Sequence, residues 1–513
     1  MLLRFVIILL IIYCLQPCAI LLAQSLPISF YSELPSLSEV VNIDSKHNNT
    51  LKFSKNQFAI PVSSQFDICN SGEWCTIDNK NIWRLCIEVD NASSVNFLLS
   101  DFFLPKDAEL FVYSADSMQV YGPFTSEYNA DWLPIPPINA GIVVFEYSEP
   151  LTPDFTSPFC IKQINVEPLN SHHIAAKAEA TCHVDFDSEL FAEWQDIRRS
   201  VCKIIVGGTT ICSGVLLAST DNSFTPYVLT ARHCISSEKM AQNSIFYFNY
   251  DPDSINNRYV IGASLVATKH DVNGLLDFSL LQLNSAIPSD YNVFYAGWDV
   301  AQPTDSQAVC IHHPNGMAPQ VALTKSPLRI DSYLLYDDST FFNVVEWERG
   351  ATEIGSSGAP LFNANRNVIG ILSGGDSSCD YPKDDYFQMF SACYNKYDDD
   401  DEQLMYWLNP TKKAITKLDG SYYNKAVEIV DKMVDTTILV HPNPAYDKIV
   451  ISSSEFAINC VIMTNISGLG RVEYLYNNQQ KIIIDIANMP CGVYVCQVFI
   501  NNGGVVKKLI VKQ

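Results

Sequence analysis

The sequence predicts an all-β protein built from about three domains. At 513 residues the chain exceeds the usual length of one or two domains. Its hydrophobic content of 48% and aromatic content of 12% are typical of a packed globular protein. Short strand-like segments separated by turn residues recur in the first, middle and last parts of the chain. These three observations favour packed sheets over a disordered chain.

Charge and the N-terminus point to an exported protein. The net charge of −23 argues against binding to nucleic acid or to anionic membrane surfaces. Residues 1–23 have the features of a secretory signal, because the positive Arg4 precedes an apolar run over residues 5–15 and small and polar residues follow. Gln16 and Pro17 interrupt the apolar stretch, which disfavours an uncleaved membrane anchor.

Cysteine usage favours disulfides over metal sites. The chain has 16 cysteines, of which Cys14 and Cys18 lie in the signal segment and 14 remain. An even number in an exported chain is typical of disulfide bonding. Cys69 and Cys75 are too far apart for a zinc pair, and no histidine accompanies them at ligand spacing. We expect neither a metal nor another cofactor.

Residues 24–177 form a first block that predicts a β-sandwich of roughly eight strands. The block contains no catalytic constellation. The adjacent His172 and His173 point in different directions, and we interpret them as part of an exposed linker, not as metal ligands. Strand-like segments separated by turn signals lie at residues 95–99, 109–113 and 140–147.

A candidate catalytic histidine follows a predicted strand in the second block. The strand at residues 226–230 leads directly into Ala231-Arg232-His233-Cys234. A disulfide between Cys212 and Cys234 would close a loop of 22 residues and add on the order of 3 kcal/mol to stability in the chain-entropy model. Such a bridge would fix the loop that carries His233.

A carboxylate and a serine follow in an order that suits nucleophilic catalysis. Asp277 lies at the mouth of an apolar strand, where burial would cost several kcal/mol unless a donor such as an imidazole N–H bonds it. Ser357 lies in Gly355-Ser356-Ser357-Gly358, a tight turn that exposes its hydroxyl and the neighbouring backbone N–H groups. The chain order His233, Asp277, Ser357 is that of the chymotrypsin fold.

These motifs resemble those of trypsin-like serine proteases, and in particular those of the bacterial lysyl endopeptidases. The resemblance covers roughly residues 178–410 and implies a chymotrypsin-like double β-barrel with the catalytic cleft between the barrels. It also implies a secreted monomeric endopeptidase that acts on proteins or peptides without a cofactor. The pair His312-His313 matches a family motif near the barrel core, so we interpret it as structural. The matching segments are Thr230–Cys234, Asp277–Leu281, Phe294–Asp299, Ile311–Gly316, Gly355–Pro360 and Gly374–Cys379.

The resemblance gives each residue a role. His233 is the general base, Asp277 fixes its tautomer and stabilises the imidazolium, and Ser357 attacks the scissile carbonyl. The N–H groups of Gly355 and Ser357 hold the oxyanion, and loss of one such donor typically costs about 3 kcal/mol in the barrier. The alternative from another class is a surface-binding protein with an inactive protease fold. The presence of all three triad residues disfavours that alternative.

Specificity is expected to depend on the segment after Cys379. In lysyl endopeptidases an aspartate just ahead of a tyrosine strand pairs with the substrate lysine, and Asp384 aligns best, with Asp385 and Asp380 as close competitors. A solvated acidic loop is the alternative without a binding role. The related glutamyl endopeptidases carry a histidine where this chain has Ser373. Cleavage after lysine, then arginine, is therefore favoured over a glutamyl-type enzyme.

The resemblance also implies how a zymogen would mature. Ser356 stands where trypsin-like zymogens carry the aspartate that pairs with the new N-terminus, so that activation switch is absent. The block 24–177 is expected to be a propeptide, as in this protease group. Cleavage between Lys177 and Ala178 would begin the protease about five residues before Cys182, the cysteine whose partner in lysyl endopeptidases corresponds to Cys379. A lysine specificity would make this cleavage self-performed.

A third block follows residues 411–435, which we interpret as a linker. Alternating strands and turns over residues 436–513 predict a small seven-stranded, Ig-like β-sandwich. Its two ends, 438–447 and 491–512, resemble the C-terminal sorting domain of the type IX secretion system of Bacteroidetes-type bacteria. The resemblance implies export by the outer-membrane type IX machinery, then release or attachment at the cell surface. A sandwich that binds carbohydrate or protein is the alternative.

Overall fold

The protein is described by a computed structural model, which splits into two compact units, residues 1–422 and 423–513. The predicted signal at 1–23, His172-His173 and the predicted cleavage site Lys177-Ala178 lie outside the described residues. No helix in the described part of the chain is long and apolar enough to cross a membrane. The structure describes residues 26–38, 40–43, 57–169, 182–185, 189–254, 257–301, 307–422, 438–453, 457–465, 471–487, 489–500 and 505–512.

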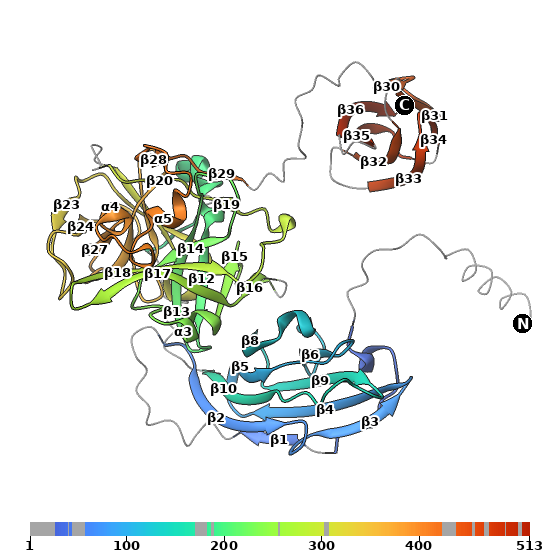
Figure 1. Cartoon of the computed structure of the whole chain (residues 1–513), viewed down its shortest axis with the longest axis horizontal. Coiled ribbons are helices and arrows are strands. Elements are labelled where there is room, and N and C mark those ends of the chain that lie inside the picture. Colours follow the sequence, from blue (N-terminus) through green and yellow to red (C-terminus); the bar gives the residue numbers. More distant parts are fainter. Residues whose placement is uncertain are drawn as a thin grey trace, which may run out of the picture. The chain divides into compact units, whose positions relative to one another are not determined.

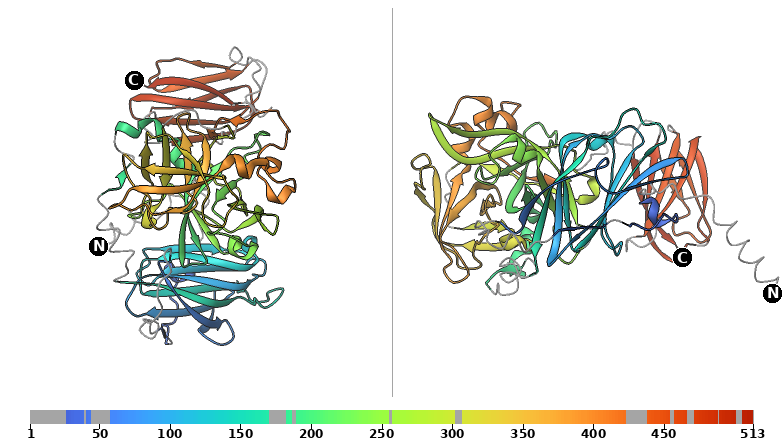
Figure 2. Two further views of the ribbon diagram at one scale, coloured as in Figure 1. Left: turned by 90° about the vertical axis from the view of Figure 1, so that its left-hand side faces the viewer. Right: turned by 90° about the horizontal axis from the view of Figure 1, so that it is seen from below.

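The N-terminal strands form two sheets packed face to face (Figure 1), and Figure 2 shows the same blue and cyan strands from two other directions. Trp83, Phe97 and Phe145 are fully buried between the sheets. The sequence predicts roughly eight strands, and the described residues contain ten. One sheet has the order β1 (Val40–Ile43), β4 (Lys80–Val89), β9 (Ile142–Pro150), β6 (Glu109–Ser114), β7 (Val120–Phe124), with β3 (Glu73–Ile77) on β4. The other has the order β2 (Ile60–Asp67), β10 (Cys160–Pro168), β5 (Ala92–Phe102), β8 (Ala130–Ile138).

A seven-stranded antiparallel sheet follows in the chain. Its strands are rich in β-branched and aromatic residues, and β12, β13 and β14 are almost wholly buried, as expected for strands inside a closed core. The strand order is β16 (Arg258–Ile261), β15 (Ser244–Phe248), β12 (Val201–Val206), β13 (Thr210–Leu217), β14 (Tyr227–Thr230), β18 (Gly274–Leu283), β17 (Ala263–Asp271).

A ten-stranded sheet forms the second half of this region. Its main path is β11 (Val184–Asp185), β22 (Gln320–Thr324), β21 (Ala308–His312), β25 (Pro360–Asn363), β26 (Val368–Gly375), β27 (Lys383–Met389), β24 (Phe341–Glu346), β23 (Arg329–Asp331). The helices among the described residues are short: α3 (Glu238–Gln242), α4 (Phe390–Asn395) and α5 (Met405–Leu408). The 3-10 turns are η1 (Ile28–Phe30), η3 (Ser126–Tyr128), η4 (Glu189–Trp194), η5 (Ile197–Ser200), η6 (Ser289–Tyr291), η7 (Pro314–Gly316) and η8 (Asp400–Glu402). The two sheets confirm the all-β class.

The chain after residue 410 differs from the prediction. Strand β28 (Lys417–Leu418) pairs with β20 (Trp298–Asp299), and β29 (Ser421–Tyr422) pairs with β19 (Phe294–Tyr295). Residues 417–422 therefore belong to the first unit and not to the linker that the sequence predicts for 411–435. These strands have two residues each, which is too short to give a sequence periodicity.

The second unit is a smaller pair of sheets. Seven strands lie in its described residues, the number that the sequence predicts. Its core contains isoleucines of both sheets, among them Ile449, Ile458 and Ile510. The sheet orders are β30 (Ile438–His441), β31 (Lys448–Ser453), β34 (Lys481–Asp485) and β33 (Arg471–Gln479), β32 (Ile458–Asn465), β35 (Gly492–Ile500), β36 (Val505–Lys512).

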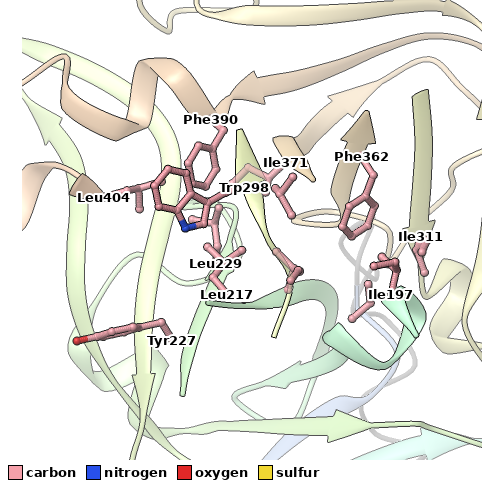
Figure 3. Packing of buried hydrophobic residues seen from close by; sticks show 14 of the residues in the cluster. Ile197, Leu217, Tyr227, Leu229, Trp298, Ile311, Phe362, Ile371, Phe390 and Leu404 are labelled. Carbon is pink, nitrogen blue, oxygen red and sulfur yellow. The ribbon is translucent and has the colours of Figure 1, made fainter. Parts of the chain in front are cut away.

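The seven- and ten-stranded sheets share one core, in which Trp298 is the largest fully buried side chain (Figure 3). Its indole Nε1–H donates to the Ala218 carbonyl at 2.9 Å, and its ring stacks on Phe390 at 5.9 Å between centroids. Leu229 of the first sheet and Ile371 of the second belong to the same cluster. This shared core fixes the two sheets against each other.

Replacing Trp298 by Ala should destabilise the first unit by about 3–5 kcal/mol, because it leaves a large cavity where the sheets meet. The measurement is urea unfolding followed by circular dichroism in an inactive Ser357→Ala background. Leu335, which is 89% exposed, is the control. Its replacement by Ala should lower the free energy of unfolding by less than about 0.5 kcal/mol. Equal effects of the two changes would contradict the shared core.

Candidate active site

His233, which follows the end of one strand, meets Asp277 on the neighbouring strand. Strand β14 ends at Thr230 and the chain turns into His233, while Asp277 lies on the adjacent antiparallel β18. The Nδ1 atom of His233 lies 2.8 Å from Oδ2 of Asp277, and the His233 backbone N–H donates to Oδ1 at 2.9 Å. The Asp277 side chain is fully buried and that of His233 is 31% exposed. One carboxylate thus holds both the ring and the backbone of the histidine.

The pair perturbs the pKa values of both groups. Burial alone would raise the pKa of Asp277, but the charge and hydrogen bond of His233 and the Ser373 hydroxyl outweigh it and lower the pKa. Burial alone would lower the pKa of His233, but the charge and hydrogen bond of Asp277 raise it above 6.5. Because an ionised carboxylate can only accept, Nδ1 carries the proton and Nε2 is the basic nitrogen.

Ser357 lies in a turn that is fastened to the same strands. The Ser213 N–H, on β13, donates to the Ser357 carbonyl at 2.8 Å, and Ser213 Oγ donates to the Gly355 carbonyl at 3.0 Å. A Cβ on Gly358 would lie 2.2 Å from Oγ1 of Thr230, so the turn packs directly on the end of β14. Gly355 and Gly358 have φ of +89° and +80°, which glycine adopts without strain. The structure thus brings the Ser357 turn to the strand end that leads to His233.

One peptide of this turn is oriented by a neighbouring loop. The Asn315 backbone N–H donates to the Ile354 carbonyl at 2.6 Å. In a trans peptide the carbonyl and the following N–H point in opposite directions, so this bond turns the Gly355 N–H away from Asn315. Among the described residues, none accepts a hydrogen bond from that N–H.

The two candidate specificity carboxylates lie in different surroundings. Asp385 is 1% exposed, and its Oδ2 accepts from Trp347 Nε1 and Thr352 Oγ1, both at 2.6 Å. Burial raises the pKa of Asp385 to about 7, against the opposing effect of these donors. Asp384 is half-buried and accepts from the Tyr381 hydroxyl at 3.0 Å. No lysine or arginine in the described part of the chain forms an ion pair with Asp384.

The structure contains both disulfides that the sequence suggests, Cys212–Cys234 and Cys182–Cys379. Nine further described cysteines are unpaired, so the even cysteine count does not mean general pairing. Among the described residues, one group of potential metal ligands comes together, Cys182, His183 and Cys379, but its two sulfurs are joined in the disulfide.

The histidine pair at the end of β21 is buried in the protein interior. His312 Nδ1 lies 2.7 Å from Ser356 Oγ, and His313 Nδ1 lies 2.8 Å from the Met317 carbonyl oxygen. Burial lowers the pKa of His313 to about 3 and that of His312 well below its usual value. The two neutral rings hold neighbouring turns, in keeping with a structural role.

Several supporting residues escape sequence reasoning. Ser213 fastens the Ser357 turn, and Gln388 Oε1 accepts from the Asp277 N–H at 2.9 Å across 111 positions of sequence. Neither residue has a local motif. The only sequence signal for Ser213 is its position directly after Cys212, within the loop that the disulfide closes.

Comparison with known proteins follows the same division of the chain. Residues 176–389 match the family described as lysyl endopeptidase, C-terminal domain, and residues 439–512 match the secretion system C-terminal sorting domain. A lysyl endopeptidase of Pseudomonas aeruginosa is 29% identical over 209 residues, which are 37% of this chain and 43% of that protein. The match thus spans less than half of that relative's length.

Two solved structures are similar over 37% of this chain. An inactive form of Rv3671c from M. tuberculosis is 18% identical over 82% of its chain, with a TM-score of 0.26. A Glu endopeptidase in complex with MPD is 14% identical over 85% of its chain, with a TM-score of 0.27. The family matches define two parts of this chain. One part matches a lysyl endopeptidase domain and the other a secretion-system sorting domain, and these matches indicate a secreted or cell-surface protein.

Proposed function

We propose that the chain is a serine endopeptidase that uses Ser357, His233 and Asp277 to form and hydrolyse an acyl-enzyme. The observation that carries the proposal is the buried Asp277 carboxylate, which holds the His233 ring and backbone beside the Ser357 turn. The match of this segment to the lysyl endopeptidase family supports the same chemistry.

In the proposed mechanism Ser357 Oγ attacks the scissile carbonyl carbon while Nε2 of His233 takes its proton. Asp277 stabilises the imidazolium, and the N–H groups of Gly355 and Ser357 bind the oxyanion. The intermediate collapses with transfer of the proton from His233 to the leaving amine. Water then attacks the acyl-enzyme with His233 again as base, which regenerates the Ser357 hydroxyl.

Changing Ser357 to Ala should reduce peptide hydrolysis by about 10⁶-fold in kcat, because no acyl-enzyme can form. A fluorophosphonate probe should label the wild-type processed protein at Ser357 and leave the variant unlabelled. Ser356→Ala, which alters the neighbouring hydroxyl, controls for labelling at the wrong serine. Failure of the wild type to label after removal of residues 24–177 would favour a binding role over an enzyme.

The rate should depend on pH through His233. A protonated imidazole cannot act as a base, so kcat/KM rises with pH through the raised pKa of His233, above its ordinary value of 6.5. Asp277→Asn removes both the charge and the acceptor that raise this pKa. In the variant the acid limb of the pH–rate profile should move to lower pH, and kcat should fall by about 10⁴-fold. An acid limb at the same pH in both proteins would contradict the assignment.

We propose that the enzyme cleaves after lysine and that Asp384 binds the substrate ammonium. Its carboxylate is half-exposed and has no cationic partner among the described residues, whereas the buried Asp385 already accepts from Trp347 and Thr352. A substrate lysine would give Asp384 the missing partner. The related family supports the choice of lysine. Asp385 then has a structural role, in which its hydrogen bonds to Trp347 and Thr352 anchor strand β27.

Asp384→Asn should lower kcat/KM for lysyl peptides by about 30- to 5,000-fold, which corresponds to about 2–5 kcal/mol for the lost partner of a charge pair that the bound substrate buries. Steady-state kinetics with peptides that differ only in having Lys, Arg or Glu before the cleaved bond would measure this change in kcat/KM. The exposed Asp380, changed to Asn, serves as the control and should leave the rate unchanged. A peptide library cut only after Glu would instead identify a glutamyl-type enzyme.

Maturation and export complete the proposal. Residues 24–177 act as a propeptide that is removed between Lys177 and Ala178 by the enzyme itself, and the sorting domain is recognised by the type IX machinery of the outer membrane. The lysine at the end of the propeptide fits the proposed specificity. Normal removal of the propeptide in the Ser357→Ala variant would exclude self-cleavage.

A further inference from the structure

The Glu353 carboxylate lies at the start of the Ser357 turn and collects donors from three distant segments. Its Oε2 accepts from Asn315 Nδ2 at 2.7 Å and lies 3.2 Å from His183 Nε2, and its Oε1 accepts from the Cys379 N–H at 3.2 Å. The His183 side chain is 2% exposed and that of Glu353 21% exposed. The hydrogen bond from His183 is the largest of the effects that lower the pKa of Glu353. The carboxylate is thus held in its charged form.

Asn315 connects this carboxylate to the candidate oxyanion site. Its side chain bonds Glu353, and its backbone N–H bonds the Ile354 carbonyl at 2.6 Å. The Ile354 carbonyl and the Gly355 N–H belong to the same peptide, so the position of Asn315 sets the direction of that N–H. Asn315 has a φ of 49° and Gly355 a φ of 89°, and such left-handed backbone needs support for a non-glycine residue.

The following peptide of the turn is held by other groups. Ser213 Oγ donates to the Gly355 carbonyl, and the Glu353 N–H donates to Ser356 Oγ at 3.1 Å. The orientation of the Gly355 N–H therefore depends on the Asn315 contact, while the position of the Ser357 carbonyl depends on Ser213. Loss of the Glu353 carboxylate should therefore change the orientation of the Gly355 N–H and leave the position of the Ser357 carbonyl unchanged.

His183 ties the beginning of the described protease segment to this network. It follows Cys182, whose disulfide partner Cys379 also donates its N–H to Glu353. The next two residues form β11, which pairs with β22. The segment 182–185 is therefore held by the Cys182–Cys379 disulfide, by two strand residues and by the contact of His183 with Glu353.

We infer that Glu353 is a positioning residue of the proposed peptidase, which sets the direction of the Gly355 N–H through Asn315 and is itself held by His183. The inference rests on the proposed function. Glu353 touches neither the substrate nor the nucleophile. Its effect is on the oxyanion of the transition state, and binding of the substrate side chain does not involve it.

The test compares Glu353→Gln with wild type. Glutamine keeps the shape but replaces one acceptor oxygen by an NH₂ that faces a donor. The expected kcat for a lysyl amide falls by about 10- to 100-fold, short of the 10²–10³ for complete loss of one oxyanion donor, and KM stays within about twofold. The affinity for a peptide aldehyde, whose hemiacetal oxygen occupies the oxyanion position, should fall by a similar factor. The affinity for an alkylamine, which binds without forming a covalent bond, should not change.

Matched variants separate positioning from folding. His183→Phe keeps a flat ring but loses the N–H that bonds Glu353, so it should lower both kcat and the affinity for the aldehyde. His183→Gln retains an N–H donor and should keep most of the kcat and of the aldehyde affinity. Glu348→Gln is the control, because that carboxylate is 44% exposed and pairs with Lys325 at 3.6 Å. If Glu353→Gln fails to fold, the two His183 variants give the same comparison.

Each outcome has one meaning. A wild type without peptidase activity removes the proposed function. An active wild type with an inactive Ser357→Ala variant keeps that function, and the inference is then overturned if the Glu353 and His183 variants retain kcat and aldehyde affinity. It is also overturned if alkylamine affinity falls along with kcat, since that pattern marks a general disruption of the site.

Discussion

The burial of one carboxylate, Asp277, constrains the rest of the site. An ionised carboxylate without partners costs far more to bury than a domain can offset, so donors must converge on it. The ring and the backbone N–H of His233 supply two, and this requires β14 to end directly beside β18. The Cys212–Cys234 disulfide closes the segment that contains β14 and His233. The position of His233 thus follows from the need of the buried Asp277 carboxylate for hydrogen-bond donors.

The serine reaches this pair because the two sheets share a core. Trp298 and its neighbours join the seven- and ten-stranded sheets, and the Ser357 turn, which precedes β25 of the second, is bonded to Ser213 of the first. Gly358 permits the contact, since any side chain there would collide with Thr230. The proposed nucleophile and base come from different sheets and are held together by packing and by backbone hydrogen bonds.

Much of this could be predicted from the sequence, for identifiable reasons. His233, Asp277 and Ser357 stand in local motifs whose residue types follow from the chemistry, so their order in the chain was informative. Gln388 and Asn315 have no such motif, because their partners lie far away in sequence and any polar residue of suitable length would look the same. The two-residue strands β28 and β29 were missed for a related reason, as their pairing depends on tertiary contacts and not on a periodic pattern.

The proposed specificity site shows the same limit of prediction from sequence, because Asp384 and Asp385 are adjacent acids. Asp384 has a left-handed backbone with a φ of 60°, which interrupts the alternation of side chains along β27, and an unaligned sequence does not tell which of the two acids is buried. The structure separates them by their donors. Asp385 is buried among neutral donors with a pKa raised to about 7, so near neutrality it carries much less than a full charge. The proposal that Asp384 binds the substrate ammonium follows from this separation, because Trp347 and Thr352 already donate to Asp385 whereas Asp384 is half-buried.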